Sequence, residues 1–199
     1  MLERNLMKRN RLLGLVVVFI GSSVLCEVTK PVISQSPMNQ DQLVIYRVFL
    51  RSYNNGSTAR VNLSKLTSTF TKTDAACLQG IELDPTGSYN STIHMFDSHT
   101  TFPGNVHLVD PEEQENAIQQ NDPGQAIRQG KDVNGAVEAG FSAGLLTLSE
   151  VAFDRNHRYA AMSFSFVCGG LCGHGSTAVF EKKNGKWHQL KRRCGGWVS

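Results

Sequence analysis

Apolar residues follow a helical spacing in the first half of the chain and alternate in the last third. The stretch 41–56, DQLVIYRVFLRSYNNG, is mostly apolar, and its polar positions Arg47, Arg51 and Asn54 form one narrow stripe. This spacing predicts a helix that is buried on most of its circumference, with Asp41 as N-cap and Gly56 at the C-cap. The many β-branched and aromatic residues favour a buried strand instead, but the length and the two caps favour the helix.

Capping residues predict two further helices. Asp110 can cap a helix that begins at Pro111, has several glutamates in its first turns and runs to about Gln120. This helix has few apolar residues, so we expect it on the surface, and the following NDPG breaks it. Asp132 can cap another helix. One face of that helix is formed by Val133, Ala136, Val137, Gly140, Phe141 and Gly144.

From Leu145 onward the apolar residues alternate with polar ones, which is the period of a strand. LLTLSEVAF, YAAMSFSFVC, STAVFEKK and KWHQLKRR read as four consecutive strands, and NGK at 184–186 is a strong hairpin signal. Short connections predict an antiparallel meander. Shorter strands are expected near 61–66 and at 106–109. The fold class is therefore α+β: a C-terminal four-stranded antiparallel meander packed against two or three helices and stapled by disulfides.

The N-terminus has the three-part pattern of a secretory signal peptide. Basic RNLMKRNR precedes the apolar run LLGLVVVFI, and small residues follow. The uncharged stretch between Arg11 and Cys26 is shorter than the about 20 residues of a spanning helix. We therefore expect a signal peptide over residues 1–26, starting at Met1 or Met7, and no membrane span in the mature protein.

Export places the mature protein in the periplasm or outside the cell. Cys26 stands where a lipoprotein cysteine would, but the bulky Leu25 before it disfavours lipidation. Residues 27–40 are polar and contain two prolines, so we expect a flexible lead-in. Residues 41–199 have the length of a single globular domain.

Composition and charge narrow the function classes. Hydrophobic residues make up 40% of the chain and charged residues 19%, which is ordinary globular usage. Four of the 20 basic and one of the 17 acidic residues lie in the first 26, which leaves 16 of each. A neutral mature chain gives no reason to expect a nucleic-acid partner. Acidic residues gather in 110–138 and basic ones in 181–199, which favours attraction between these segments or a basic edge for an acidic partner.

Without Cys26 the cysteines form an even set, which indicates disulfides in an exported protein, with three connectivities open. The four are Cys77, Cys168, Cys172 and Cys194. In CGGLCGHG, a three-residue loop between facing strand positions would bring Cys168 and Cys172 within disulfide distance. This favours Cys168–Cys172 with Cys77–Cys194 as the second bridge.

Two chemical interpretations of CGGLCGHG compete with the disulfide. Cys168, Cys172 and His174 offer three zinc ligands, but no second paired unit lies nearby. A thioredoxin-like site needs Cys-x-x-Cys at a helix start, and here the spacing is Cys-x-x-x-Cys between strands. His174 could support a thiolate on Cys172, so it is the one candidate functional residue.

No other motif predicts catalysis. His94, Asp97 and His99 in HMFDSH lack the spacing of a metalloprotease helix, and no G-x-S-x-G elbow is present. Surface positions are expected for these histidines. We therefore predict no catalytic residue, no metal ligand and no cofactor.

The last third, from LSEVAF to the closing WVS, resembles a family of bacterial exported proteins with no known activity. The family shares the CGGLCG turn, a Gly-Lys-Trp hairpin and a closing Trp-x-Ser. The resemblance implies an exported location and this fold but transfers no activity. The favoured function is a non-catalytic binding or envelope-associated domain with a protein or small-molecule partner. The alternative is an enzyme with a thiol-based or hydrolytic site near His174.

Overall fold

The structure is a computed structural model that describes residues 31–70, 77–87, 89, 91–192 and 194–199. The predicted signal peptide, including Cys26, and residues 27–30 of the lead-in lie outside this part. The elements are β1 (Val32–Ile33), α1 (Gln40–Asn54), β2 (Val61–Ser64), β3 (Thr92–Ile93), β4 (Val106–Val109), α2 (Pro111–Gln120), α3 (Pro123–Arg128), α4 (Val133–Ala143), β5 (Leu145–Leu148), β6 (Ala152–Phe153), β7 (Tyr159–Gly169), β8 (Cys172–Lys183), β9 (Lys186–Gln189) and β10 (Gly196–Val198).

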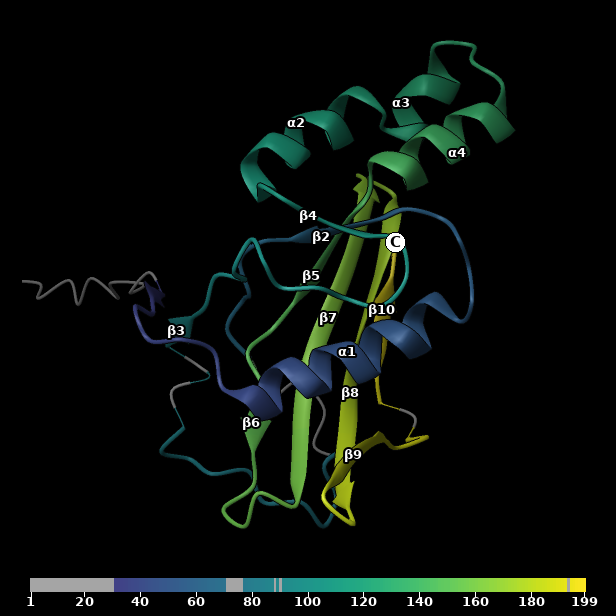
Figure 1. The fold of residues 1–199 in the computed structure, drawn as a ribbon. Coiled ribbons are helices and arrows are strands. Elements are labelled where there is room, and N and C mark those ends of the chain that lie inside the picture. Colours follow the sequence, from purple (N-terminus) through teal and green to yellow (C-terminus); the bar gives the residue numbers. More distant parts are fainter. Residues whose placement is uncertain (1–30, 71–76, 88, 90, 193) are drawn as a thin grey trace, which may run out of the picture.

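A curved sheet of eight strands organises the chain (Figure 1). Its path runs β10-β8-β7-β5-β2-β4, while β6 also pairs with β7 and β9 with β8. The pairs β5–β7, β7–β8 and β8–β9 are antiparallel, whereas β2 pairs in parallel with both β4 and β5. The predicted α+β class is confirmed. The meander of four strands alone is not confirmed, because its strands belong to this larger mixed sheet.

Helix α1 packs across one face of the sheet (Figure 1). Its apolar side contributes Ile45, Tyr46, Phe49 and Leu50, all at most 2% exposed. The predicted helix is present, but its caps differ. Asn39 is the N-cap, because its side chain and that of Gln42 form a capping box, and Asn55 ends the helix in the left-handed conformation.

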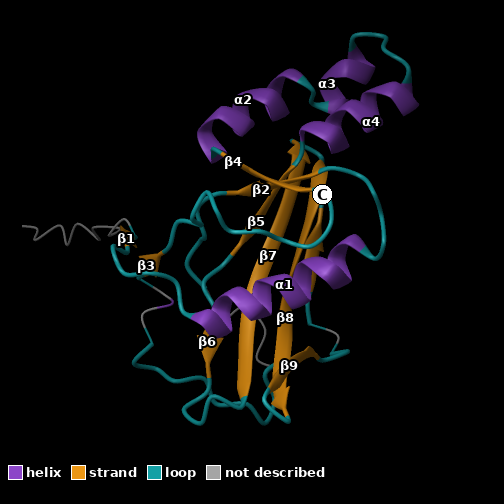
Figure 2. Cartoon of the chain, viewed as in Figure 1, coloured by secondary structure: helices purple, strands orange, loops and turns teal. Residues whose placement is uncertain are grey.

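Helices α2, α3 and α4 form a cap at one end of the long strands (Figure 2). Asp110 and Asp132 cap α2 and α4 as predicted. The NDPG stretch ends α2 and also starts α3, because Asp122 caps the new helix and Pro123 takes its first position. The hairpin strand β9 lies at the other end of the sheet from α2 (Figure 1), and no ion pair joins 110–138 to the described residues of 181–199.

The second face of the sheet is covered over only part of its length. A smaller core cluster that includes Phe70, Cys77 and Leu78 packs against Ala161 and Val179 near the β9 end. Toward the helical cap, the same face carries Ser163, Ser165 and Thr177 instead. Among the described residues, no helix combines the length and the apolar composition that crossing a bilayer requires. The short strand β1 falls within the predicted lead-in and pairs in parallel with β3.

Candidate functional site

A groove of about 460 Å³ lies on the sheet face opposite α1. We call it the hydroxyl groove and define it by the side chains of Thr147, Ser163, Ser165, Thr177 and Trp197. Strand alternation creates it, since Leu146, Leu148, Phe166 and Ala178 point to the α1 core and the residues between them point the other way. The SFSF run of β7 therefore presents aromatic side chains to the core and hydroxyls to the groove.

One cross-strand row spans the hydroxyl groove. Thr147 of β5 is paired with Ser165 of β7, Ser165 with Gly175 of β8, and Gly175 with Trp197 of β10. The neighbouring row includes Ser163, whose hydroxyl lies 3.2 Å from that of Thr177. Within the described part of the chain, the hydroxyls of Thr147 and Ser165 have no protein hydrogen-bond partner, so both are available to a ligand.

The indole of Trp197 lies over the glycines of the CGGLCGHG motif. A methyl group on Gly175 would lie 2.5 Å from Nε1 of Trp197, and one on Gly173 would lie 3.0 Å from the same ring. Both positions must therefore lack a side chain for the ring to rest on β8. Trp197 remains 45% exposed, so the indole forms one wall of the hydroxyl groove.

The disulfide predictions are confirmed. Cys168–Cys172 closes the β7–β8 turn with a Cα–Cα distance of 5.0 Å, and Cys77–Cys194 joins segments 117 residues apart. None of the described cysteines is a free thiol, and the described residues contain no grouping of three or more His, Cys, Asp or Glu side chains that could hold a metal ion. Two disulfides are typical of a protein outside the cytoplasm.

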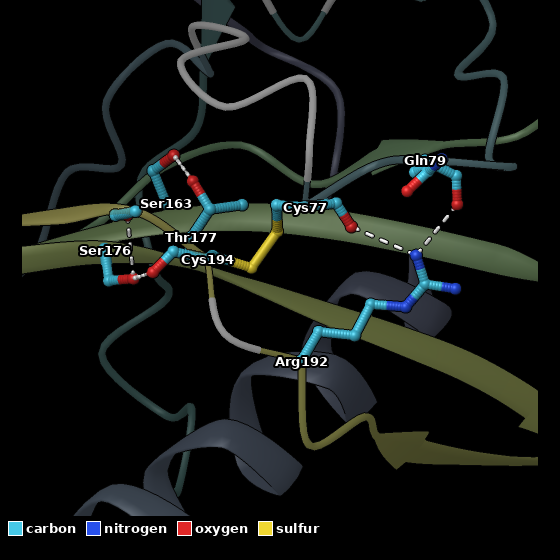
Figure 3. The surroundings of a disulfide bond; sticks show 8 residues. Cys77, Gln79, Ser163, Ser176, Thr177, Arg192 and Cys194 are labelled. Atoms are coloured by element: carbon cyan, nitrogen blue, oxygen red, sulfur yellow. Dashed lines mark hydrogen bonds between the residues drawn. A yellow bond between two sulfur atoms is a disulfide. The ribbon is translucent and has the colours of Figure 1, made fainter.

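The Cys77–Cys194 bridge fixes the C-terminal segment beside the hydroxyl groove (Figure 3). Arg192 donates to the backbone oxygens of Cys77 and Gln79 at 3.1 and 3.0 Å. Ser176 donates from its hydroxyl to the backbone oxygen of Gly195 at 3.2 Å. These contacts anchor the chain just before β10 and so position Trp197.

His174 points to the opposite face of β8 from Gly173 and Gly175. Its ring packs against Tyr53, Phe164 and Phe166, with centroid distances between 5.5 and 6.1 Å, and Nε2 lies 3.3 Å from the Tyr53 hydroxyl. Burial alone raises the pKa of Tyr53 to about 12. The partly buried His174 thus joins the end of α1 to the sheet and lies on the other side of it from the hydroxyl groove.

Sequence reasoning missed a buried carboxylate at Glu150, whose side chain is 3% exposed. It accepts hydrogen bonds from the side chains of Thr67 and Gln42 and from the backbone N–H of His94. The ring Nδ1 of His94 lies 3.0 Å from Oε2. The surface position expected for His94 is wrong, because its side chain is only 13% exposed. Glu150 is the single charged residue in the 145–153 run, which was the available signal.

The Glu150–His94 pair borders a small pocket of about 220 Å³. A carboxylate that holds Nδ1 leaves Nε2 of the same imidazole for a second partner, which is the arrangement of a general base. Asp84 and Asp154 also border this pocket, but each accepts hydrogen bonds within its own turn. Each oxygen of Glu150 has two hydrogen-bond contacts, from Thr67 and the His94 N–H on Oε1 and from Gln42 and the His94 ring on Oε2, so the carboxylate has a structural role.

No family model matches the chain, and neither a curated protein nor a solved structure shows a significant similarity to it.

Proposed function

We propose that the protein is an exported, non-catalytic domain that binds a ligand or an envelope component in the hydroxyl groove. The observation that carries this proposal is the cross-strand row from Thr147 to Trp197, with free hydroxyls at one end and an exposed indole at the other. A sheet can leave one face in water, and that face then carries polar side chains. A neutral, partly aromatic face with an open volume is typical of a binding site.

Export is supported by two independent features. The N-terminal sequence has the pattern of a signal peptide, and the two disulfides require an oxidising compartment to form. The resemblance of the C-terminal third to bacterial exported proteins points the same way. Periplasmic and extracellular destinations both meet these requirements.

Co-sedimentation tests the binding function. The disulfide-bonded protein is mixed with the washed, insoluble envelope fraction of the producing cells, and bound protein is quantified after centrifugation. We expect Ser165→Arg, which fills the hydroxyl groove, to abolish binding. Thr58→Arg places the same side chain at an exposed site outside the groove and should bind as the wild type does. Equal binding by both variants would refute the proposed function.

A second candidate function, hydrolysis, is supported by the Glu150–His94 pair. This observation favours His94 over His174 as the site, because the Nε2 of His174 already contacts Tyr53. His94 would take a proton from water, and Glu150 would hold the ring in position. Hydrolysis of a panel of chromogenic esters by the wild type, abolished in His94→Gln with an unchanged melting temperature, would support it. No turnover by the wild type would count against it.

A further inference from the structure

The described lining of the hydroxyl groove is uncharged. None of the described residues that line it carries a charge, although charged residues make up 19% of the chain. Phosphate and carboxylate ligands are recognised by Arg or Lys side chains, in which the charge supplies much of the binding energy. The composition therefore argues against a nucleotide, a phospholipid headgroup or an acidic peptide.

The groove also differs from a site for a purely apolar molecule. A hydrocarbon placed against Thr147 and Ser165 would remove water from both hydroxyls without replacing their hydrogen bonds, which costs free energy for each. An extended peptide that joins a sheet needs a free strand edge. Of the four strands that form the floor (β5, β7, β8 and β10), only the three-residue β10 lies at the end of the sheet path and has an open edge. The floor therefore offers mainly side-chain groups for recognition.

The geometry suits a ligand with an apolar face and a polar rim. Trp197 contacts Gly173 and Gly175 with atoms of both indole rings and is 45% exposed, which leaves part of the flat indole for contact with a ligand. Three strand spacings of about 4.8 Å separate Trp197 from Thr147, so the row is about 14 Å long. The hydroxyl of Ser165 lies between the two ends and can both donate and accept.

We infer that the hydroxyl groove binds an uncharged oligosaccharide, with one pyranose ring stacked on Trp197 and the next rings along Ser165 and Thr147. A pyranose presents axial C–H groups on its face and hydroxyls around its rim. The C–H face matches an indole, and the rim matches a row of Ser and Thr hydroxyls that can serve as donor or acceptor. This inference names the ligand class of the proposed binding function and rests on that function.

Isothermal titration calorimetry with defined probes tests the ligand class. The probes are the neutral hexaoses of β-1,4-linked N-acetylglucosamine, β-1,4-linked glucose and α-1,4-linked glucose, with oligogalacturonate as the acidic comparison. We expect at least one neutral hexaose to bind and the acidic one not to bind. Trp197→Ala should weaken binding roughly tenfold, the upper end for one aromatic contact, and Trp197→Phe should retain most of the affinity. Thr58→Ala is the matched control for Ser165→Ala, which should weaken binding.

Periodate treatment of the envelope fraction helps to separate this inference from the proposed function, because periodate cleaves sugars with vicinal diols, such as 1,4-linked glucose. Internal units of β-1,4-linked N-acetylglucosamine have no vicinal diol, so the titration alone tests that ligand. If Ser165→Arg abolishes sedimentation while periodate has no effect and no neutral hexaose binds, the oligosaccharide inference is overturned and the binding function stands. Preference for oligogalacturonate would also overturn the inference. Absence of any binding that depends on the groove would overturn both. Far-ultraviolet circular dichroism and thermal melts of every variant verify that the fold is retained.

Discussion

The carboxylate of Asp122 accepts a hydrogen bond from the backbone N–H of Gly170 at 2.6 Å. Its other oxygen accepts from the N–H of Gln125 at 2.7 Å and thereby caps α3. A single side chain thus joins the helical cap to the disulfide-closed turn of β7 and β8. A side chain on Gly169, where φ is +150°, would also collide with Asp122. The first two glycines of the motif therefore permit this contact.

Asp122→Asn should lower stability at neutral pH and not in acid. The Gly170 N–H, followed by the Gln125 N–H, holds the pKa of Asp122 below its ordinary value of 3.8. A carboxylate whose pKa is lower in the folded than in the unfolded protein stabilises the fold at pH values above the unfolded-state pKa. This stabilisation is lost as the pH falls through the folded-state pKa. Urea unfolding at pH 7 should show a loss of about 0.5 kcal/mol, and the wild type and the variant should converge below pH 3.8.

Asp132→Asn is the matched comparison, because Asp132 caps α4 through Gly135 and makes no contact with the β7–β8 turn. If both variants lose the same stability at pH 7, the contact between Asp122 and Gly170 contributes nothing beyond the helix cap.

Gly175→Ala should destabilise the protein and displace Trp197. The added methyl would lie 2.5 Å from the indole Nε1 and 2.7 Å from the backbone oxygen of Phe164, and the second contact cannot be relieved by turning a side chain. We expect a loss of about 1–3 kcal/mol, as for overpacked sites, with a red shift of tryptophan emission. Gly135→Ala is the control: its methyl meets only Asp132 at 3.6 Å, so helix propensity should raise stability by up to about 1 kcal/mol. Unchanged stability of Gly175→Ala would contradict the packing.

The two disulfides should contribute unequally. Loop closure over 117 residues predicts a contribution of about 5 kcal/mol for Cys77–Cys194, and the short Cys168–Cys172 loop predicts about 2 kcal/mol. Urea unfolding of the two paired Cys→Ala variants measures both. Peptide mapping without reduction should recover these two linkages. A Cys77–Cys172 or Cys168–Cys194 peptide would contradict the fold itself.

Tyr53 should ionise far above the usual range of tyrosine. Burial raises its pKa to about 12, compared with 10.0 for a free tyrosine. Absorbance at the phenolate band should therefore rise identically in the wild type and in Tyr53→Phe up to about pH 11 and should diverge above it. A smaller rise in the variant near pH 10 would mean that Tyr53 is exposed and does not pack on His174.

Local signals in the sequence were sufficient for several elements. Asp110 followed by Pro111 predicted the start of α2, Asp132 predicted the start of α4, and the alternating β7 sequence predicted a two-faced strand. The N-cap of α1 was assigned to Asp41 instead of Asn39. The pair Asn39 and Gln42 has capping-box spacing, so the sequence itself carries the signal that places the N-cap at Asn39.

Long-range partners could not be predicted, because periodicity identifies an element but not its neighbour. The parallel pairing of Asn62 with Leu145 joins positions far apart in sequence, and nothing local to either strand specifies it. The same limit applies to Glu150, whose Gln42 and His94 partners are 108 and 56 residues away. The hydroxyl groove could not be predicted either, because the row from Thr147 to Trp197 depends on the register of four strands.

The Cys77–Cys194 bridge makes the position of Trp197 depend on the oxidation state of two cysteines. Trp197 follows Cys194 by three residues and belongs to a strand of three residues, so the sulfur link is the covalent anchor of this segment. In a reduced chain, the segment that carries Trp197 keeps only its non-covalent contacts, which include the pairing of β10 with β8 and the hydrogen bond from Ser176. If the hydroxyl groove binds the proposed ligand, formation of this disulfide would strengthen that binding by holding the indole in place.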